Sequence, residues 1–540
     1  MRSQAANSAQ LRSAAIATPH PAAADAAKQI LLAGGNAIDA AVGAMLACCV
    51  VTPGAVGLGG YGGSLVAYLA RSRKTIAIDF DSRAPLAYRP EFFSDNSQSY
   101  ESGYLSITVP AVVAGLALAL EKFGTQSWAA VSQPAIRLAE DGITISLLLK
   151  KQLDDFAKKA DRVSQQALFP GGNVPAAGET WRQPDVARLL VRLAENGPQA
   201  FYRGEIPQTI VHQVQTGGGI LSEQDFEQYQ PAVAEPLAID YRGYRVLTPR
   251  PPSGGLTTLQ ILKVLEQFNF SQLQPWSSDY FHLFAEATKL CWQDRIAYFG
   301  DPDATEIPVG QLLSAEAATA KAARIDRVRA QRFAADNSAS PHHTANILVA
   351  DREGNVVSVT ATQGYLYGSQ VAIDRLGLVM GHGMSRFDLA AGSPNAPAAG
   401  KRMFHNMAPA ILLNSANHPF AAVGLPGGPK IVTVTAQLII NLIDFHASPA
   451  AAVSAPRIHI EANEPLAITA TVPESVAEQL RSFGHTVIHG QTVGGQPDEI
   501  GGKANAIVID PATRSMTAAS QAGEAAACIL NGDSDCLDLQ

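Results

Sequence analysis

The spacing of apolar positions predicts helices in the first part of the chain. The pattern is helical and alanine-rich from Pro21 to about Cys49, with a stop at Gly34-Gly35-Asn36. Residues 110–215 are also mainly helical in pattern, whereas Ser64–Tyr68 has the composition of a strand. Because the longest apolar stretch, Ala40–Val51, is shorter than the roughly 20 residues that span a bilayer, we expect it to form a buried helix.

A change of pattern near residue 343 divides the chain. Residues 320–332 are rich in Ala, Arg and Lys, which predicts a solvated helix. Residues 335–343 have the small and polar composition of an exposed linker. Two β-rich runs follow, Thr344–Ala350 and Val356–Thr362, with a hairpin signature at Asp351–Asn355 between them. We therefore expect a β-hairpin to begin directly after the linker.

The expected hairpin brings two threonines together. If it is symmetric about Glu353, Thr344 and Thr362 form a directly opposed cross-strand pair. The β-carbons of such a pair lie about 4.5–5.5 Å apart. The sequence therefore predicts that the Thr344 side chain meets the Thr362 side chain at the start of the hairpin.

Cleavage of the bond between His343 and Thr344 would place a nucleophile and a base in one residue. The α-amino group that cleavage frees on Thr344 has an unperturbed pKa of about 8, so it can accept the hydroxyl proton at neutral pH. The hydroxyl can first attack the carbonyl of His343 and form an ester that water opens. One geometry therefore serves both self-cleavage and attack on an amide substrate.

Acyl transfer also needs hydrogen-bond donors that face the developing oxyanion, each contributing roughly a hundred- to thousandfold in rate. The turn Gly424-Leu425-Pro426-Gly427-Gly428-Pro429 contains two consecutive glycines. Without side chains, Gly427 and Gly428 can turn their backbone N–H groups into a crowded site. We therefore take these two glycines as the candidate oxyanion donors.

Charge and cysteine content narrow the class of protein. The formal net charge is −8 and no run of Lys or Arg interrupts the chain, so we expect no nucleic-acid or membrane partner. The five cysteines follow no metal-ligand spacing; Cys48 and Cys49 are expected to be buried, and Cys528 and Cys536 could close a small loop. Histidines such as His382 and His405 stand singly, and we expect them to be structural or pocket-lining.

The N-terminus lacks the apolar core that a secretory signal needs. As the sequence stands, a cytoplasmic location is expected, or a periplasmic or secreted one if a signal peptide has been removed. Nucleophile, base and oxyanion donors all come from the chain, so we expect no metal and no organic cofactor.

Many short motifs in a constant order resemble the γ-glutamyltranspeptidase family, and the resemblance runs from about Ala15 to Ser520. Besides the Thr344 hairpin, the matching stretches are Gly34–Ala41, Gly57–Gly60, Phe201–Glu205, Asp240–Arg245, Pro251–Gly255, Gly300–Pro302, Lys401–Arg402 and Pro426–Gly428. The resemblance implies an α+β fold of the N-terminal nucleophile hydrolases, an αββα four-layer sandwich with two antiparallel sheets between helical layers.

The same resemblance implies two fragments and a set of catalytic residues. Residues 1–343 would form a large subunit and residues 344–540 a small subunit, held together as a heterodimer. By position, Thr344 matches the nucleophile of the family and Thr362 matches the threonine that supports it. Gly427 and Gly428 match the oxyanion hole.

The substrate positions depart from the family pattern. The arginine that grips the α-carboxylate of the glutamyl group follows an Asp-Phe pair, but Asp81 stands there in this chain, with Arg83 two residues further on. The aspartate that holds the α-amino group falls at Arg386. The paired serines of the family fall at His405 and Asn406, and an asparagine near the nucleophile falls at Gly364. Because a buried charge needs a partner, Asp81 and Arg386 are expected either to pair with each other or to bind a substrate of different polarity.

Three functions follow as hypotheses. The leading one is a γ-glutamyltranspeptidase-like amide hydrolase or acyltransferase that acts on a small amide or γ-glutamyl substrate through an acyl-Thr344 intermediate. The second is a cephalosporin-acylase-like enzyme, or another amidase, whose acyl group lacks the amino-acid head. The third, from another class, is an unprocessed binding or scaffold protein with the same fold.

Overall fold

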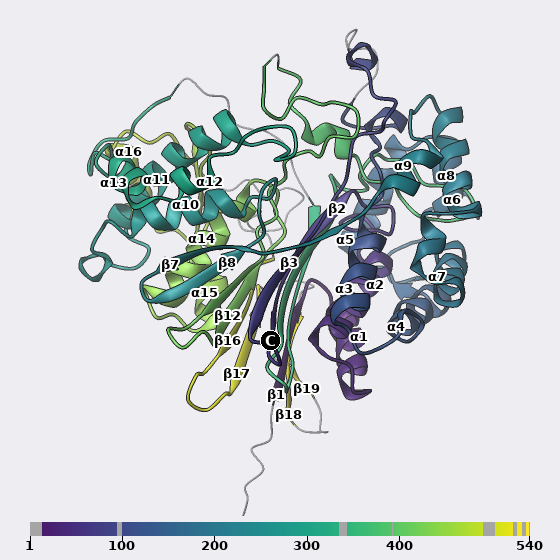
Figure 1. The fold of residues 1–540 in the computed structure, drawn as a ribbon, viewed down its shortest axis with the longest axis horizontal. Helices are drawn as coiled ribbons and strands as arrows, with labels where there is room; N and C mark the ends of the chain where they lie inside the picture. Colours follow the sequence, from purple (N-terminus) through teal and green to yellow (C-terminus); the bar gives the residue numbers. More distant parts are fainter. Residues whose placement is uncertain are drawn as a thin grey trace, which may run out of the picture.

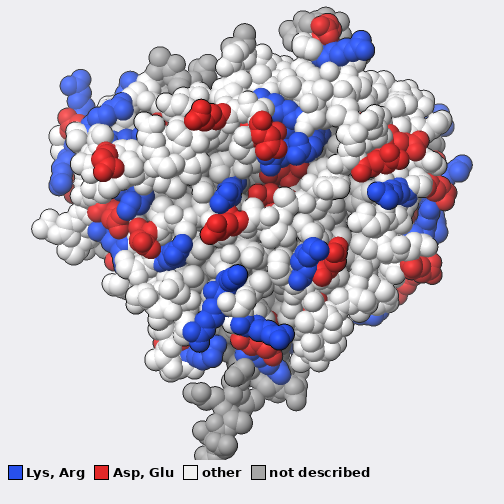
Figure 2. Space-filling model, viewed as in Figure 1, with Lys and Arg blue, Asp and Glu red and all other residues white. Residues whose placement is uncertain are grey.

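The computed structural model describes residues 13–93, 100–333, 343–390, 392–489, 503–521, 526–531 and 536–538. For residues 13, 343, 526–531 and 536–538 it describes the backbone alone. No helix among these residues is long and apolar enough to cross a membrane. Lys and Arg side chains are interspersed with Asp and Glu over the face shown in Figure 2, so charge of one sign does not dominate that face.

Two antiparallel β-sheets form the middle of the molecule (Figure 1). The eight-stranded sheet has the order β19 (Cys536–Asp538), β18 (Ala526–Asn531), β1 (Ser13–Thr18), β9 (His343–Ala350), β10 (Val356–Gly364), β2 (Gly62–Leu69), β3 (Lys74–Asp81) and β6 (Ala232–Ala234). The six-stranded sheet has the order β17 (Met516–Ser520), β16 (Asn505–Ile509), β12 (Pro419–Gly424), β11 (Ala410–Leu413), β8 (Tyr244–Thr248) and β7 (Leu237–Tyr241). Strands from both sides of residue 343 therefore pair within each sheet.

Helices cover the outer face of each sheet (Figure 1). The eight-stranded sheet is covered by α1 (Pro21–Leu32), α2 (Ala37–Val51), α3 (Val112–Phe123), α4 (Trp128–Asp141), α5 (Leu147–Lys159), α6 (Arg162–Leu168), α7 (Pro184–Asn196), α8 (Glu205–Thr216) and α9 (Glu223–Gln228). The six-stranded sheet is covered by α10 (Gly255–Leu265), α11 (Ser278–Tyr298), α12 (Val309–Leu312), α13 (Ala315–Ala322), α14 (Lys430–Ile443), α15 (Pro449–Ser454) and α16 (Glu474–Ser482). The predicted αββα sandwich is confirmed.

Short strands complete the two helical layers. A two-stranded sheet pairs β4 (Ile143–Thr144) with β5 (Thr180–Trp181). A three-stranded sheet contains β13 (Ile458–His459), β14 (Leu466–Ile468) and β15 (Val487–His489), of which β14 and β15 run parallel.

Alternation along β9 decides which side chains face the space between the two sheets. Ala345, Ile347 and Val349 pack in the core beneath α1 to α7, whereas Leu348 and Ala350 pack between the sheets. Because successive side chains of a strand point to opposite faces, Thr344 lies on the inter-sheet face with Leu348 and Ala350. The space between the sheets is thus apolar near the hairpin turn and polar near Thr344.

The helical expectations hold for the first part of the chain and fail at one segment. Every residue of α2 is buried, as the apolar stretch predicts, and Cys48 and Cys49 are free, buried thiols. The helix predicted at 320–332 is wrong, because α13 ends at Ala322. Residues after it are held by backbone contacts to other parts of the chain, such as the bond from Ala330 N to Phe483 O at 2.7 Å. The linker at 335–342 and the side chains of Cys528 and Cys536 lie outside the described residues.

Candidate active site

The hairpin places Thr344 beside Thr362. Strands β9 and β10 pair in the predicted register from Ala345–Ala361 to Ala350–Val356, and the register shifts by one residue after Ala361. The hydroxyl of Thr344 donates to the hydroxyl of Thr362 at 3.2 Å. Thr362 Oγ1 also accepts a bond from the N–H of Gly364 at 2.9 Å, which fixes its orientation. Thr344 itself is 7% exposed, so its side chain is buried between the sheets.

Asp81 lies in the same row of the sheet as the two threonines. Thr362 pairs with Gly62 of β2, and Gly62 pairs with Asp81 of β3. Adjacent strands are about 4.8 Å apart, so the backbones of Thr362 and Asp81 are roughly 10 Å apart. Asp81 belongs to the inter-sheet face because Ala77, four residues earlier in β3, packs between the sheets. A carboxylate therefore stands at one end of the row and the threonine pair at the other.

Asp81 is paired with His405 rather than with Arg386. Asp81 Oδ1 and His405 Nε2 are 2.5 Å apart and both side chains are 1% exposed, although the contact is not aligned as a hydrogen bond. His405 Nδ1 accepts the N–H of Met407 at 3.2 Å, which leaves Nε2 as the nitrogen that carries the proton toward Asp81. Of the two expectations for Asp81 and Arg386, mutual pairing is therefore wrong. The partner of the Asp81 carboxylate is the imidazole of His405.

A second carboxyl group lies on the same face of β3. Burial, and next the nearby charge of Asp81, raise the pKa of Asp79 to about 8. Asp79 Oδ1 is buried without a hydrogen-bond partner among the described residues, and so are both carboxylate oxygens of Asp81. Polar atoms of this kind are unusual inside a protein, and a bound ligand or water is one way to satisfy them. The end of the row at Asp81 is therefore a candidate substrate pocket.

Arg295 of α11 holds the segment that carries His405 and Asn406. Its guanidinium donates to His405 O at 3.0 Å and to Asn406 Oδ1 at 2.7 Å, and it is 2% exposed. The rings of Trp292, Phe299 and Phe404 surround the guanidinium at 4.6–5.4 Å from their centroids. Burial lowers the pKa of Arg295 to about 9. This large, buried contact fixes the backbone on which His405 stands.

Tyr61, which sequence reasoning missed, joins the two ends of the site. Its side chain is 5% exposed, and burial raises its pKa while the positive charge of Arg386 opposes that rise. Asp81 and Thr362 also act on the pKa of Tyr61, so its phenol lies near both side chains. Arg386 lies over the ring of Tyr365 at 5.1 Å and bonds to Ser385. Tyr61 stands between Gly60 and Gly62 in a glycine-rich run, and that position was its only sequence signal.

Two further predicted residues lie outside this arrangement. Arg83 donates to Gly400 O at 2.9 Å, lies 3.7 Å from Asp303 and lines a cavity of about 430 Å³ with Asp225 and Tyr229. These contacts do not bring Arg83 to the threonine pair. His382 is structural, as expected: it accepts the N–H of Tyr365 at 2.7 Å and burial lowers its pKa to about 3.

The two candidate oxyanion glycines form the turn between β12 and α14. Gly424, at the end of β12, packs so tightly on Asn346 of β9 that a β-carbon would lie 2.3 Å from the amide nitrogen. Asn346 is two residues after Thr344 on the same face, so the turn begins beside the start of β9. Gly427 and Gly428 have φ angles of 144° and 61°, which side chains disfavour. The N-terminus of α14 follows, and its dipole favours a negative charge there.

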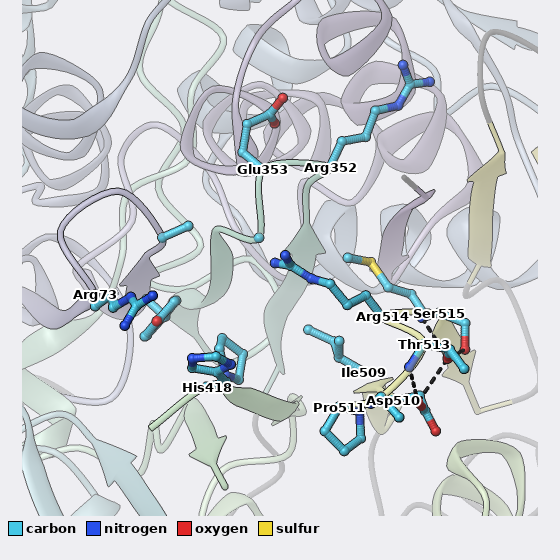
Figure 3. Close-up of a pocket in the computed structure, with 16 residues that line it drawn as sticks. Arg73, Arg352, Glu353, His418, Ile509, Asp510, Pro511, Thr513, Arg514 and Ser515 are labelled. Carbon is cyan, nitrogen blue, oxygen red and sulfur yellow. Dashed lines mark hydrogen bonds between the residues drawn. The ribbon is translucent and has the colours of Figure 1, made fainter. Parts of the chain in front are cut away.

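A larger cavity lies at the opposite end of the sandwich. It has about 600 Å³ and is lined by turns between neighbouring strands, with Arg73, Glu353, His418 and Arg514 among its residues (Figure 3). Glu353 is in the turn of the β9–β10 hairpin, and Thr344 is at the other end of β9. The extended strand separates them by roughly 20 Å. This cavity is therefore not part of the site at Thr344.

The fold and the threonine pair together define a class of enzyme. An αββα sandwich with a threonine hydroxyl at the start of a central strand is the architecture of the N-terminal nucleophile hydrolases. The structure superimposes on the cephalosporin acylase from Bacillus halodurans with a TM-score of 0.85 and 29% identity, over 97% of this chain and 98% of that chain. The agreement covers both sheets and both helical layers.

Sequence comparison gives the family within that class. The sequence profile described as Gamma-glutamyltranspeptidase matches residues 23–528. The chain is 33% identical over 498 residues to the glutathione hydrolase proenzyme of Bacillus subtilis (strain 168), with 87% of this chain and 84% of that protein covered. It is 35% identical over 511 residues to the acylase ACY 1 proenzyme of Pseudomonas sp. (strain SE83), with 92% and 90% covered. The chain belongs to the γ-glutamyltranspeptidase family, as its motifs predict, and is an enzyme of the hydrolase and acyltransferase type.

Proposed function

We propose that the chain cleaves itself between His343 and Thr344 and then transfers acyl groups through an ester on Thr344. The observation that carries the proposal is the bond from the Thr344 hydroxyl to the Thr362 hydroxyl at the first position of the small subunit. Names of relatives in the family support it, because both the glutathione hydrolase and the acylase are called proenzymes. The products are a large subunit of residues 1–343 and a small one of residues 344–540, which remain together because strands of one pair with strands of the other in both sheets.

The chemistry needs only groups that the chain supplies. In cleavage, Thr344 Oγ1 attacks the carbonyl carbon of His343, the C–N bond breaks, and the α-amino group of Thr344 receives a proton. Water then hydrolyses the ester and frees the hydroxyl. In turnover the α-amino group takes the hydroxyl proton as an amide substrate is attacked, and the leaving amine is protonated. The acyl ester passes to water or to an amine acceptor.

The remaining assigned residues have roles in this reaction. Thr362 orients the nucleophile, and the N–H groups of Gly427 and Gly428 stabilise the oxyanion, helped by the N-terminus of α14. Asp81, His405 and Asn406 form the far end of the acyl pocket, and Arg386 approaches it beside Tyr61. Arg83 makes contacts outside this pocket, so it has no role in our proposal.

The Asp81–His405 pair favours a second candidate substrate class. A buried carboxylate repels a substrate carboxylate placed against it. A γ-glutamyl group therefore cannot present its α-carboxylate to Asp81, whereas an uncharged or amine-bearing acyl group can occupy this end of the pocket. Cephalosporin-acylase-like or other amidase activity is the alternative that this observation favours.

A substrate panel separates the two classes. We expect the processed protein to hydrolyse uncharged acyl anilides faster than γ-glutamyl-p-nitroanilide or a glutaryl anilide, by roughly tenfold or more in kcat/KM. Both of the slower substrates place a carboxylate in the pocket, and one altered pocket contact changes discrimination by about 1–3 kcal/mol. Asp81→Asn should change the ranking of these substrates by a similar factor. Rapid turnover of the γ-glutamyl compound alone would remove the altered-pocket proposal and leave acyl transfer itself intact.

Thr362→Ala is expected to slow self-cleavage by about tenfold without unfolding the protein, since one hydrogen bond of about 1.4 kcal/mol to the nucleophile is lost. The rate is measured as the disappearance of the full-length chain on denaturing gels. Thr362→Ser is the matched control, because it keeps the hydroxyl that Thr344 contacts. Wild-type rates in Thr362→Ala would show that this bond has no part in the reaction.

A further inference from the structure

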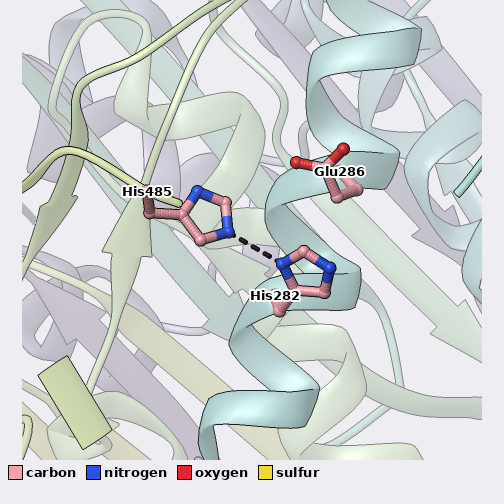
Figure 4. Close-up of side chains that lie close together, drawn as sticks. All are labelled: His282, Glu286 and His485. Carbon is pink, nitrogen blue, oxygen red and sulfur yellow. Dashed lines mark hydrogen bonds between the residues drawn. The ribbon is translucent and has the colours of Figure 1, made fainter. Parts of the chain in front are cut away.

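A buried cluster of five ionisable side chains lies far from the threonine pair in sequence and is not used by the proposed reaction. His282, Glu286 and Lys289 project from α11, while Glu464 and His485 come from segments near the small three-stranded sheet. Figure 4 shows the two imidazole rings facing each other with Glu286 nearby. The α11 residues are 0% exposed and His485 is 4% exposed. Groups of this kind must satisfy each other, since water does not reach them.

Four groups form one continuous chain of contacts. Glu464 Oε1 lies 2.9 Å from His485 Nδ1. His485 Nε2 lies 2.8 Å from His282 Nδ1, and His282 Nε2 lies 2.7 Å from the backbone oxygen of Asp326. At one end the backbone oxygen of Asp326 can only accept a hydrogen bond. At the other end the Glu464 oxygen can also only accept, provided that Glu464 is ionised.

The hydrogen bonds along this chain need one more N–H hydrogen than two neutral imidazole rings carry. Three contacts each need one hydrogen, and a neutral imidazole carries one. Burial alone would raise the pKa of Glu464, but the bonds from His485 and the charge of Lys289 outweigh it and lower the pKa to about 2, so Glu464 does not supply the third. Burial lowers the pKa of His282 to about 4, which makes His282 the neutral ring. The additional proton therefore belongs to His485, which donates to Glu464 and to His282.

That proton also balances the charge of the cluster. Lys289 Nζ lies 2.5 Å from Glu286 Oε1 and 3.1 Å from Glu464 Oε1. Burial raises the pKa of Glu286, and Lys289 opposes that rise. With both carboxylates ionised, Lys289 compensates one negative charge and a doubly protonated His485 compensates the other. The Asp326 carboxylate and Lys289 also act on His282, with opposite signs.

The cluster holds together the parts of the chain that self-cleavage would separate. Lys289 donates to Gln331 O at 2.6 Å, and Glu286 accepts the N–H of Gln331 at 3.1 Å. These bonds, with the His282 contact to Asp326, fasten the segment 326–331 just before the linker. His282, Glu286 and Lys289 lie before residue 343, whereas Glu464 and His485 lie after it.

We propose that the His282–His485 pair holds one extra proton at neutral pH, and that this charge-balanced cluster braces the end of the large subunit against the small one. The role of the cluster between two subunits rests on the proposed self-cleavage. The extra proton on the imidazole pair does not depend on self-cleavage. A metal ion is the competing occupant, because His282, Glu286 and His485 offer atoms within 4.8 Å of one another. A proton fits better, since the ring nitrogens are only 2.8 Å apart and Lys289 already neutralises Glu286.

The sign of the pH dependence follows from the two shifted groups. The pKa of Glu464 is lowered from 4.5 to about 2, so its contribution to stability is present above pH 4.5 and is lost as the pH falls toward 2. The pKa of His282 is lowered from 6.5 to about 4, so the neutral ring stabilises the fold above pH 6.5 and this contribution is lost as the pH falls toward 4. The cluster is therefore expected to become less stable in acid, first because His282 is protonated in addition to His485.

Nitrogen NMR of the full chain labelled with ¹⁵N-histidine counts the protons directly. At pH 7.5 we expect His485 to show two protonated ring nitrogens and His282 to show one, with His485→Asn and His282→Asn used for assignment. One protonated nitrogen on each ring would overturn the proposal, and so would a stoichiometric metal ion found by elemental analysis of the purified protein. The same spectra of the uncleaved Thr344→Ala chain keep this test independent of self-cleavage.

Glu464→Gln tests the charge balance. Gln keeps an oxygen that accepts from His485 but removes the negative charge, so His485 is expected to lose one ring proton and the unfolding midpoint to fall by about 5 °C or more. Glu474→Gln is the matched control, because Glu474 pairs with the exposed His489 at 3.3 Å and should change the midpoint by less than about 1 °C. An unchanged proton count in Glu464→Gln would contradict the balance even if the midpoint fell.

Discussion

Thr344→Ala is expected to leave the chain as one polypeptide of 540 residues with no measurable amidase activity, whereas the wild type is expected to give fragments of 343 and 197 residues. Alanine removes the only hydroxyl that can attack both the His343 carbonyl and the substrate, so kcat should fall by at least about 10⁴-fold. Denaturing gels and mass spectrometry measure the cleavage, and hydrolysis of acyl anilides measures the activity.

Thr344→Ser is the control for this experiment. It keeps the hydroxyl and the bond to Thr362, so it should still mature and turn over, although more slowly. Activity in Thr344→Ala, or active wild-type protein in which His343 is still joined to Thr344, would contradict the assignment. A wild type that stays in one piece on long incubation would favour the scaffold hypothesis.

Gly427→Ala is expected to lower kcat by roughly a hundredfold while KM changes little, because the substitution disturbs a backbone N–H that serves the transition state. The φ angle of 144° at Gly427 is one that alanine rarely adopts, so the amide must rotate. Maturation should slow as well, since in our proposal the same N–H stabilises the oxyanion of self-cleavage. Steady-state kinetics on the matured fraction give both constants.

Backbone strain alone must be separated from the loss of the donor. Gly243→Ala serves this purpose, because Gly243 also has a positive φ of 83° and has open space around its α-carbon. It should reduce stability without altering kcat. If Gly427→Ala matured protein kept the wild-type kcat, the oxyanion role of this turn would be wrong.

The parts of the site that sequence analysis predicted well are local ones. The register of the β9–β10 hairpin followed from its turn and from the alternation of its strands, so the approach of Thr344 to Thr362 was available without coordinates. The buried helix α2 followed in the same way from an apolar stretch. Both depend on neighbours within about twenty residues.

The failures are those in which distant residues decide the outcome. The helix predicted at 320–332 has suitable composition, but buried groups of α11 bind the backbone at Gln331 and Asp326 in a non-helical form. Pairing of Asp81 with Arg386 was one of two expectations, yet His405 is the partner of Asp81, because the packing of distant segments brings residues 324 positions apart into contact. The position of Tyr61 in a glycine-rich run did not indicate a role in the site, since its surroundings depend on three separate segments of the chain.

By itself, the sequence determined the family, the four-layer architecture, and the pairing of a potential nucleophile with a supporting hydroxyl at the start of a strand. The threonine pairing follows from strand alternation and turn chemistry, which act over short stretches of chain, whereas the family and the architecture were implied by the order of motifs that resemble the family. Tertiary structure alone decided which charges meet in the proposed acyl pocket and how His282, His485, Glu464 and Lys289 combine across the two halves. The physical reason is that the partner of a buried charge is selected by the packing of distant elements, and composition does not encode it.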